Sequence, residues 1–170
     1  MVSLRFLSWS FRYGEQILNS KLTLRKEVED ALTAIQVPEH GLSRPQLNVE
    51  IEKQLVDRGW KTQPKVAGDR EDLEIQAKLD FIKERIGVEV AFSHASFIGI
   101  DLLKFQTMSY AALDQIDVGM YIVATGNLLK RMKEKGQKWE GSITFEKVQR
   151  YLPQFKSAIQ VPIFVLGLDE

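Results

Sequence analysis

The stretch that decides the interpretation of this chain is Leu79-Asp80-Phe81-Ile82-Lys83-Glu84-Arg85-Ile86-Gly87-Val88-Glu89-Val90-Ala91-Phe92. Ile86, Val88 and Val90 alternate with Gly87 and Glu89, which is the period of two expected of a β-strand. The charged residues just before this alternation predict a turn. Glu89 therefore falls inside a strand that we expect to be nearly buried.

Asp80 and Glu89 are the acidic residues that stand out by their surroundings. A carboxylate in a buried strand is unfavourable unless it is paired or binds a cation. If Asp80 lies on a neighbouring strand or bend, both carboxylates can reach one ion, and a backbone carbonyl and waters complete the oxygen octahedron of Mg²⁺. Such an ion polarises a phosphate and activates water. The alternative is a solvent-facing Glu89, with Gly87 and Ala91 on the same outer face.

The composition is that of an ordinary globular protein, with 170 residues, of which 44% are hydrophobic and 27% charged. Basic and acidic residues number 23 each, which argues against a protein that coats nucleic acid but allows a local basic face. There is no cysteine, so disulfides, cysteine-ligated zinc and thiol catalysis are excluded. With His40 and His94 as the only histidines, a metal must be held by oxygen. The length favours a single domain over residues 1–170.

We expect neither a targeting segment nor a membrane span. The first ten residues are short and interrupted by Arg5, unlike a signal peptide. The longest apolar run, near residues 161–168, falls far below the roughly 18 residues of a membrane span. The sequence therefore predicts a soluble, cytoplasmic protein.

Periodicity in the rest of the chain predicts an α/β fold, a mixed central β-sheet flanked by helices on both faces. Strands are expected at 2–9, 86–90, 117–123 and 161–168, and helices beginning at Thr23 and Ser43 and covering 102–113, 128–135 and 145–151. Residues 97–100 either continue as a strand or enter the following helix. Residues 72–79 are expected to form a helical turn or two.

The central stretch resembles the catalytic core of the BglII/BstYI-like type II restriction endonucleases, a group within the PD-(D/E)xK nuclease superfamily. Its pattern Asp-Phe-x-Lys-x-Arg-x-x-x-Glu-Val is much more specific than the bare superfamily motif. The resemblance runs with gaps over nearly the whole chain, although the part before Pro45 is shorter than is usual in the family. It implies a restriction-endonuclease-like fold and Mg²⁺-assisted hydrolysis of double-stranded DNA.

The resemblance also implies roles for individual residues. Asp80 and Glu89 match the catalytic carboxylates that bind the metal, with the backbone carbonyl of Val90 as a further ligand. The next motif position normally carries Lys, Glu or Gln, which orients or activates the attacking water, but here it is Ala91. A methyl group can do neither, so we expect specific DNA binding with weak or no cleavage, and a gain on restoring Gln or Lys.

Three explanations of Ala91 remain open. The protein is an inactive relative, or the alanine is a deliberate substitution because an active restriction enzyme is toxic without its methylase. In the third explanation another residue replaces the missing group, and Lys83 and His94 are the nearest candidates in the sequence.

Basic charge is concentrated between residues 130 and 156, a segment that contains eight Lys and Arg residues but only three Glu residues. A surface that contacts phosphates is a natural use of such an excess, and a solvated helix is the alternative. The residues expected to contact DNA are Ser93, His94, Asn127, Lys130, Arg131, Lys133 and Lys138. Asn48 matches a polar position in the family and is otherwise helix surface.

The resemblance further implies a palindromic site with a GATC centre. Two-fold homodimers cut such sites, because each strand needs one active centre. The helix expected at 102–113 either supplies the dimer surface or belongs to the core. The rival interpretation is a non-catalytic DNA-binding relative with the same fold.

Overall fold

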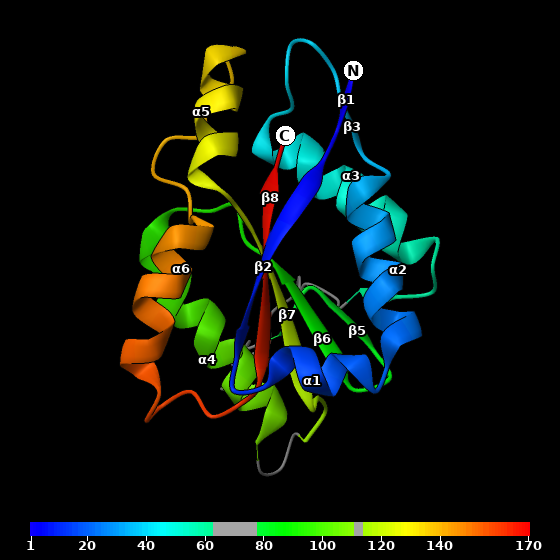
Figure 1. The fold of residues 1–170 in the computed structure, drawn as a ribbon, viewed down its shortest axis with the longest axis vertical. Coiled ribbons are helices and arrows are strands. Elements are labelled where there is room, and N and C mark those ends of the chain that lie inside the picture. The colour runs from blue at the N-terminus through cyan, green and yellow to red at the C-terminus, as the bar shows by residue number, and fades with distance from the viewer. Residues whose placement is uncertain (63–77, 111–113) are drawn as a thin grey trace, which may run out of the picture.

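A mixed six-stranded β-sheet forms the centre of the protein (Figure 1). The computed structural model describes residues 1–62, 78–110 and 114–170. The strands lie in the order β2 (Arg5–Phe11), β8 (Ile163–Asp169), β7 (Val118–Ala124), β6 (Ile86–Val90), β5 (Phe81–Lys83) and β4 (Lys61–Thr62). The three central strands β8, β7 and β6 are parallel, and the outer pairs are antiparallel. The prediction of a mixed central sheet is confirmed.

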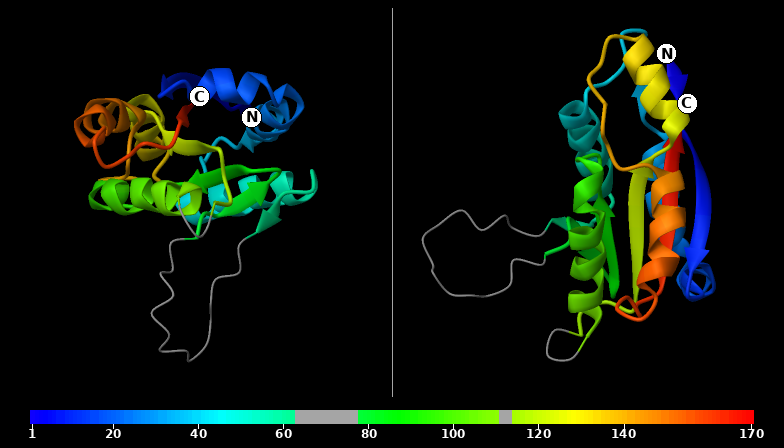
Figure 2. Two further views of the ribbon diagram at one scale, coloured as in Figure 1. Left: turned by 90° about the horizontal axis from the view of Figure 1, so that it is seen from below. Right: turned by 90° about the vertical axis from the view of Figure 1, so that its left-hand side faces the viewer.

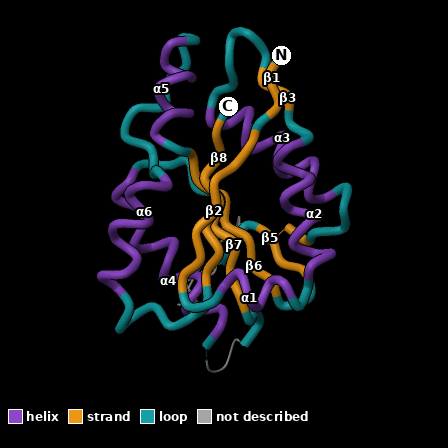
Figure 3. The backbone as a smooth tube through the Cα atoms, viewed as in Figure 1, coloured by secondary structure: helices purple, strands orange, loops and turns teal. Residues whose placement is uncertain are grey.

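Helices cover both faces of this sheet (Figures 1 and 3). On one face lie α2 (Leu22–Thr33) and α3 (Arg44–Val56), reached from β2 through the short α1 (Gly14–Asn19). On the other face lie α4 (Ile98–Ser109) and α6 (Phe145–Tyr151) (Figure 2). Helix α5 (Gly126–Glu134) begins directly after β7, at the carboxyl end of the parallel strands.

The alternation of side chains in the central strands divides the core into two halves. Val88 of β6 and Met120 of β7 join the apolar cluster under α2 and α3. Ala91 and Tyr121 join the opposite cluster, together with residues of α4 and α6. Because successive side chains of a strand point to opposite faces, Glu89 lies on the α4 side.

Some element boundaries differ from the sequence prediction. Residues 97–100 are helical: a 3₁₀ turn, η1 (Ala95–Phe97), leads directly into α4. Helix α3 begins as expected after Ser43, which forms a capping box with Gln46. Helix α2 begins at Leu22 after Lys21, so Thr23 is not its cap. The helical turn expected at 72–79 and the end of the helix expected at 102–113 fall largely or partly outside the described residues.

Several short elements were not predicted. The two-residue strand β3 (Gln36–Val37) pairs with β1 (Val2–Ser3), which lies within the strand expected at 2–9, and the unpredicted β4 is equally short. The 3₁₀ turn η2 (Leu152–Phe155) follows α6. Segments of two or three residues have no measurable periodicity. Among the helices of the described part of the chain, none combines the length and apolarity needed to cross a membrane.

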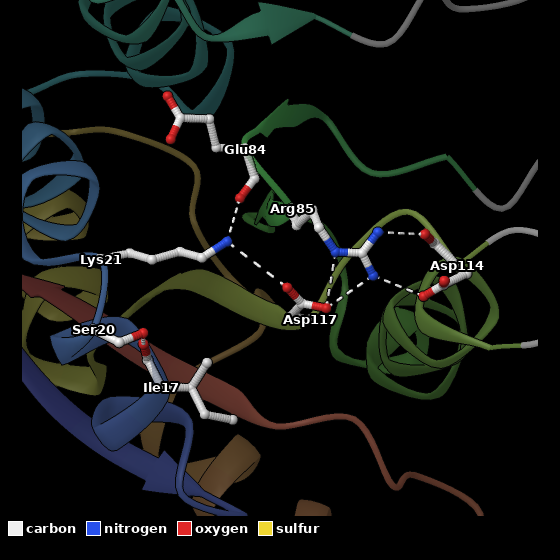
Figure 4. A network of polar contacts seen from close by, with 7 residues as sticks. All are labelled: Ile17, Ser20, Lys21, Glu84, Arg85, Asp114 and Asp117. Carbon is white, nitrogen blue, oxygen red and sulfur yellow. Dashed lines mark hydrogen bonds and ion pairs between the residues drawn. The ribbon is translucent and has the colours of Figure 1, made fainter.

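An ionic network fixes the hairpin between β5 and β6 (Figure 4). Its turn residues Glu84 and Arg85 have φ values of 44° and 68°, as in the tight turns that suit twisted hairpins. Arg85 lies 2.7 Å from a carboxylate oxygen of Asp114 and 2.8 Å from one of Asp117. Lys21 donates a 2.5 Å hydrogen bond to the carbonyl of Glu84. These contacts hold the closed end of the hairpin and thereby set the register at its open end.

Candidate active site

Asp80 and Glu89 meet at the open end of this hairpin. Phe81 pairs with Val88, so continuing the antiparallel register places Asp80 opposite Glu89. The Asp80 amide donates to Glu89 Oε2 at 3.2 Å, and the Val90 amide donates to Asp80 Oδ2 at 2.8 Å. Where the two strands separate, each carboxylate therefore accepts a hydrogen bond from a backbone amide in place of a backbone carbonyl. The result is a pair of carboxylates at the carboxyl end of β6, on the face covered by α4.

Glu89 is held in a position that favours a nearby cation. Its side chain is buried, with 4% of the residue exposed. Burial and the negative charge of Asp80 raise the pKa of Glu89 to about 8, although the hydrogen bond from Lys104 opposes this shift. Positive charge beside this carboxyl stabilises its ionised form. The solvent-facing alternative for Glu89 does not apply.

A lysine that the sequence analysis did not single out completes the site. Lys104, on α4, brings Nζ to 2.6 Å from Glu89 Oε1 and 3.6 Å from Asp101 Oδ1. The phenolic hydroxyl of Tyr121 on β7 donates to Asp101 Oδ2 at 2.8 Å. The chain thus forms a buried polar network that joins β6, α4 and β7.

The protonation of this network follows from its charges. Burial favours the neutral amine of Lys104, but the hydrogen bond and charge of Glu89 outweigh it, so the pKa of Lys104 is raised. Burial raises the pKa of Asp101, against the hydrogen bond from Tyr121 and the charge of Lys104. Burial and the charge of Asp101 raise the pKa of Tyr121. Lys104 therefore stays an ammonium at neutral pH.

Ala91 lies beneath α4. It is 3% exposed and belongs to the same apolar cluster as Ile98 and Leu102. Its amide donates to the carbonyl of Ile122 at 2.8 Å, so β6 remains bonded to β7 at this position. A longer side chain at position 91 has to find space among these α4 residues.

The donor set of the site suits a hard cation with few protein ligands. Mg²⁺ commonly binds one or two carboxylates and keeps several waters. Asp80 and Glu89 supply two carboxylates at one strand end. Residues 1–62, 78–110 and 114–170 contain no group of three or more His, Cys, Asp or Glu side chains that could hold a metal ion. A metal bound here would take its remaining ligands from backbone and water.

Two of the residues expected to contact DNA follow the site directly in the chain. Ser93 and His94 are exposed just beyond the carboxyl end of β6. The Ser93 carbonyl accepts from the Ile143 amide at 2.9 Å, which ties this segment to the loop before α6. His94 Nδ1 accepts from the Ser96 amide at 3.2 Å and caps η1. The imidazole therefore has a structural partner.

The basic residues expected at the DNA lie on α5 and the loop after it. Lys130 and Lys133 are 77% and 70% exposed, with loose ion pairs of 4.0 and 3.9 Å to Glu134 and Glu140. Arg131 and Lys138 are also exposed. Asn127 donates to Asp169 Oδ1 at 2.7 Å, so its amide is oriented by the end of β8.

The structure does not bring Lys83 and Asn48 into this network. Lys83 lies at the closed end of the hairpin, where Nζ donates to Glu27 Oε2 and to the Arg58 carbonyl, both at 2.7 Å. Asn48 is exposed on α3. The residues that sequence reasoning missed are Lys104, Asp101 and Tyr121. The available signal was an acid at position 101, within the helical spacing of the buried face of α4.

Comparison with known proteins identifies a family and a similar solved structure. The family model for restriction endonuclease BglII/BglIII matches residues 6–168. A crystal structure of restriction endonuclease BglII complexed with a DNA 16-mer is similar, with a TM-score of 0.73 and 20% sequence identity. That alignment covers 98% of this chain and 78% of the other, and at this identity it shows the shared fold. Among curated proteins, none matches this sequence. Because the family match spans nearly the whole sequence, this chain belongs to the BglII/BglIII restriction endonuclease family and is a type II site-specific deoxyribonuclease.

Proposed function

We propose that this enzyme cuts both strands of a palindromic DNA site in a Mg²⁺-dependent reaction centred on Asp80 and Glu89. The observation that carries the proposal is the pair of mutually braced carboxylates at the open end of the β5–β6 hairpin. Lys104 already pairs with Glu89, but one ammonium does not balance the two carboxylates of Asp80 and Glu89, so a divalent cation is favoured beside them.

Asp80 and Glu89 would hold the metal, with the backbone carbonyl of Val90 as a further ligand. A bound divalent ion supplies charge stabilisation to the phosphate and lowers the pKa of a coordinated water. The protein residues orient that site: the Val90 amide fixes one Asp80 oxygen, and the Asp80 amide fixes one Glu89 oxygen. Rigid placement of ligands is what makes such positioning effective.

The surface around the carboxyl ends of β6 and β7 supports DNA binding. Ser93 and His94 follow β6, and the exposed Lys130 and Lys133 lie on the helix that follows β7. Because the two strands are parallel, both connections leave the sheet at the same end. We assign phosphate contacts to Lys130, Arg131, Lys133 and Lys138, and base-edge contacts to Ser93, His94 and Asn127.

The assembly and site follow from the need to cut two strands. We propose a homodimer that cuts a palindrome with a GATC centre, as the resemblance to the BglII/BstYI group implies. Phe97, Ile100 and Leu103 lie about η1 and α4 and are 46%, 54% and 54% exposed. This apolar strip suits the two-fold contact, while Phe105 and Met108 of the same helix are core. We place the enzyme in the cytoplasm, with the DNA that it cuts.

Ala91 supports a second candidate, a DNA-binding relative that has lost cleavage. A methyl group at this position neither orients nor activates water. The two candidates share the fold and the specific DNA complex, and they differ only in turnover.

One experiment tests the proposal and separates the candidates. Purified protein is incubated with Mg²⁺ and a plasmid library that contains every six-base palindrome, and fragment ends are sequenced. We expect discrete ends at palindromes with a GATC centre, and a dimer by light scattering on the duplex. Ends scattered over unrelated sequences, or a strict monomer on DNA, would contradict the proposal. Specific binding without any ends would favour the non-catalytic candidate.

A further inference from the structure

Position 91 and α4 are parts of one local arrangement. Ala91 follows Glu89 by two residues, so both side chains point to the face that α4 covers. That helix packs unusually close to the sheet, because a Cβ on Gly119 of β7 would lie 2.3 Å from Phe105 Cδ1. Close packing brings Lys104, the residue before Phe105 on the helix, to the carboxylate of Glu89.

Lys104 is held in place from three elements. Its Nζ donates to Glu89 Oε1 at 2.6 Å, and Asp101 Oδ1 lies 3.6 Å away. Tyr121 fixes the other oxygen of Asp101 at 2.8 Å. The Lys104 side chain is only 23% exposed, so its ammonium group points into the site and not into bulk water.

We propose that Lys104 is a catalytic residue that supplies, from α4, the cationic hydrogen-bond donor that Ala91 cannot provide. The proposal rests on the function proposed above. One Nζ hydrogen stays bonded to Glu89 while the remaining hydrogens reach the attacking water and a non-bridging phosphate oxygen. Asp101 and Tyr121 are positioning residues that hold the ammonium in this orientation.

The proposed step is hydrolysis of the phosphodiester by water, and it needs no oxidant, reductant or further reactant. The water oxygen forms a bond to phosphorus, and the bond from phosphorus to the leaving sugar oxygen breaks with its electron pair. The attacking water loses its proton to solvent, and the leaving oxygen takes a proton from solvent. Lys104 remains an ammonium throughout and stabilises the negative charge that develops on the phosphate.

The simpler interpretation is that Lys104 only neutralises Glu89. A counter-ion of this kind would contribute to folding, whereas a catalytic donor contributes to the rate after DNA has bound. The two roles therefore differ in the ratio of cleavage rate to binding affinity.

The test compares full-length wild type with Lys104→Met, Lys104→Gln, and Lys104→Met combined with Ala91→Lys. The matched control is Lys26→Met, because Lys26 is an exposed lysine on α2. Single-turnover cleavage is measured with excess enzyme and Mg²⁺, DNA affinity is measured in EDTA, and folding is followed by thermal denaturation. Lys104→Gln keeps a donor for Glu89, so a folding defect in Lys104→Met leaves the test intact.

We expect both Lys104 variants to lose about 10²–10⁴-fold in cleavage rate, the range typical of such groups. Their affinity for DNA without metal should stay within about threefold of wild type. The added lysine at position 91 should recover at least about tenfold of the lost rate. Cleavage by both variants within about threefold of wild type would overturn the catalytic role of Lys104 but not the proposed Mg²⁺-dependent cleavage. A wild-type chain that binds DNA but never cleaves would overturn this role and the proposed Mg²⁺-dependent cleavage together.

Discussion

Phe105 of α4 lies directly over Gly119 of β7, so closely that an added Cβ would stand 2.3 Å from its ring. The same ring meets Tyr121 edge-on, with centroids 5.6 Å apart and an interplanar angle of 77°. This contact sets the height of α4 above the sheet, and with it the distance between Lys104 and Glu89. We therefore expect the proposed active site, as well as the core, to require a glycine at position 119.

Gly119→Ala tests this relationship. Overpacking of a close-packed core costs about 1–3 kcal/mol, so we expect a lower melting temperature by about 2–4 °C for each kcal/mol. Cleavage should fall as well, because the displaced helix carries Lys104. Thermal denaturation and single-turnover assays measure both effects. The double variant with Phe105→Leu should recover part of each, and a fully stable, fully active Gly119→Ala would refute the relationship.

Metal binding should stabilise the folded protein through Asp80 and Glu89. At a Mg²⁺ concentration about tenfold above its dissociation constant, linkage gives about 1.4 kcal/mol, or a rise of about 3–6 °C in melting temperature. Differential scanning fluorimetry with and without EDTA measures this shift. Asp80→Asn should abolish it, whereas Lys26→Gln should leave it intact. An undiminished shift in Asp80→Asn would place the metal elsewhere.

The metal-free protein should lose stability as the pH rises. Burial and the charge of Asp80 raise the pKa of Glu89 to about 8 from its ordinary value of 4.5, so the folded state binds an extra proton between these pH values. The contribution of Glu89 is therefore complete below about pH 4.5 and is lost as the pH rises through about 8. Glu89→Gln, which does not titrate, should gain in melting temperature relative to wild type over this range. A pH-independent difference between the two proteins would contradict the buried, acid-flanked environment of Glu89.

DNA affinity should depend on salt through the basic residues of α5. Each lysine that contacts a phosphate adds about 0.9 to the slope of log affinity against log salt concentration. We expect Lys130→Gln and Lys133→Gln each to lower this slope by about that amount, measured by fluorescence anisotropy in EDTA. Lys26→Gln, on the exposed surface of α2, should leave the slope unchanged. Equal slopes in all four proteins would remove α5 from the DNA interface.

The parts of the fold that follow from the sequence are those with a clear period. The alternation of Ile86, Val88 and Val90 predicted β6, and the apolar run near 161–168 predicted β8. The helix expected to begin at Ser43 is α3, which Ser43 caps. By contrast, the start of α2 lacks a side-chain cap, and β1, β3 and β4 are too short to show any period.

The sequence predicted the two carboxylates of the candidate site but not its lysine. Asp80 and Glu89 belong to one hairpin, so their meeting depends on a local register that the sequence carries. Lys104 reaches Glu89 only because α4 packs across β6 and β7, and that contact depends on Gly119 beneath Phe105. A lysine in a helix carries no mark of such a tertiary neighbour, whereas Lys83 and His94 are the nearest candidates along the sequence.

The most direct test of this account is single-turnover cleavage of a cognate duplex by wild type and Asp80→Asn, each with Mg²⁺ and with EDTA. DNA affinity in EDTA confirms that both proteins bind. We predict double-strand cleavage by wild type that requires Mg²⁺, and a rate at least about 10³-fold lower for Asp80→Asn, since a metal contributes several kcal/mol to the stability of the transition state. Equal cleavage by the two proteins, or cleavage that persists in EDTA, would contradict a metal-dependent centre at Asp80 and Glu89.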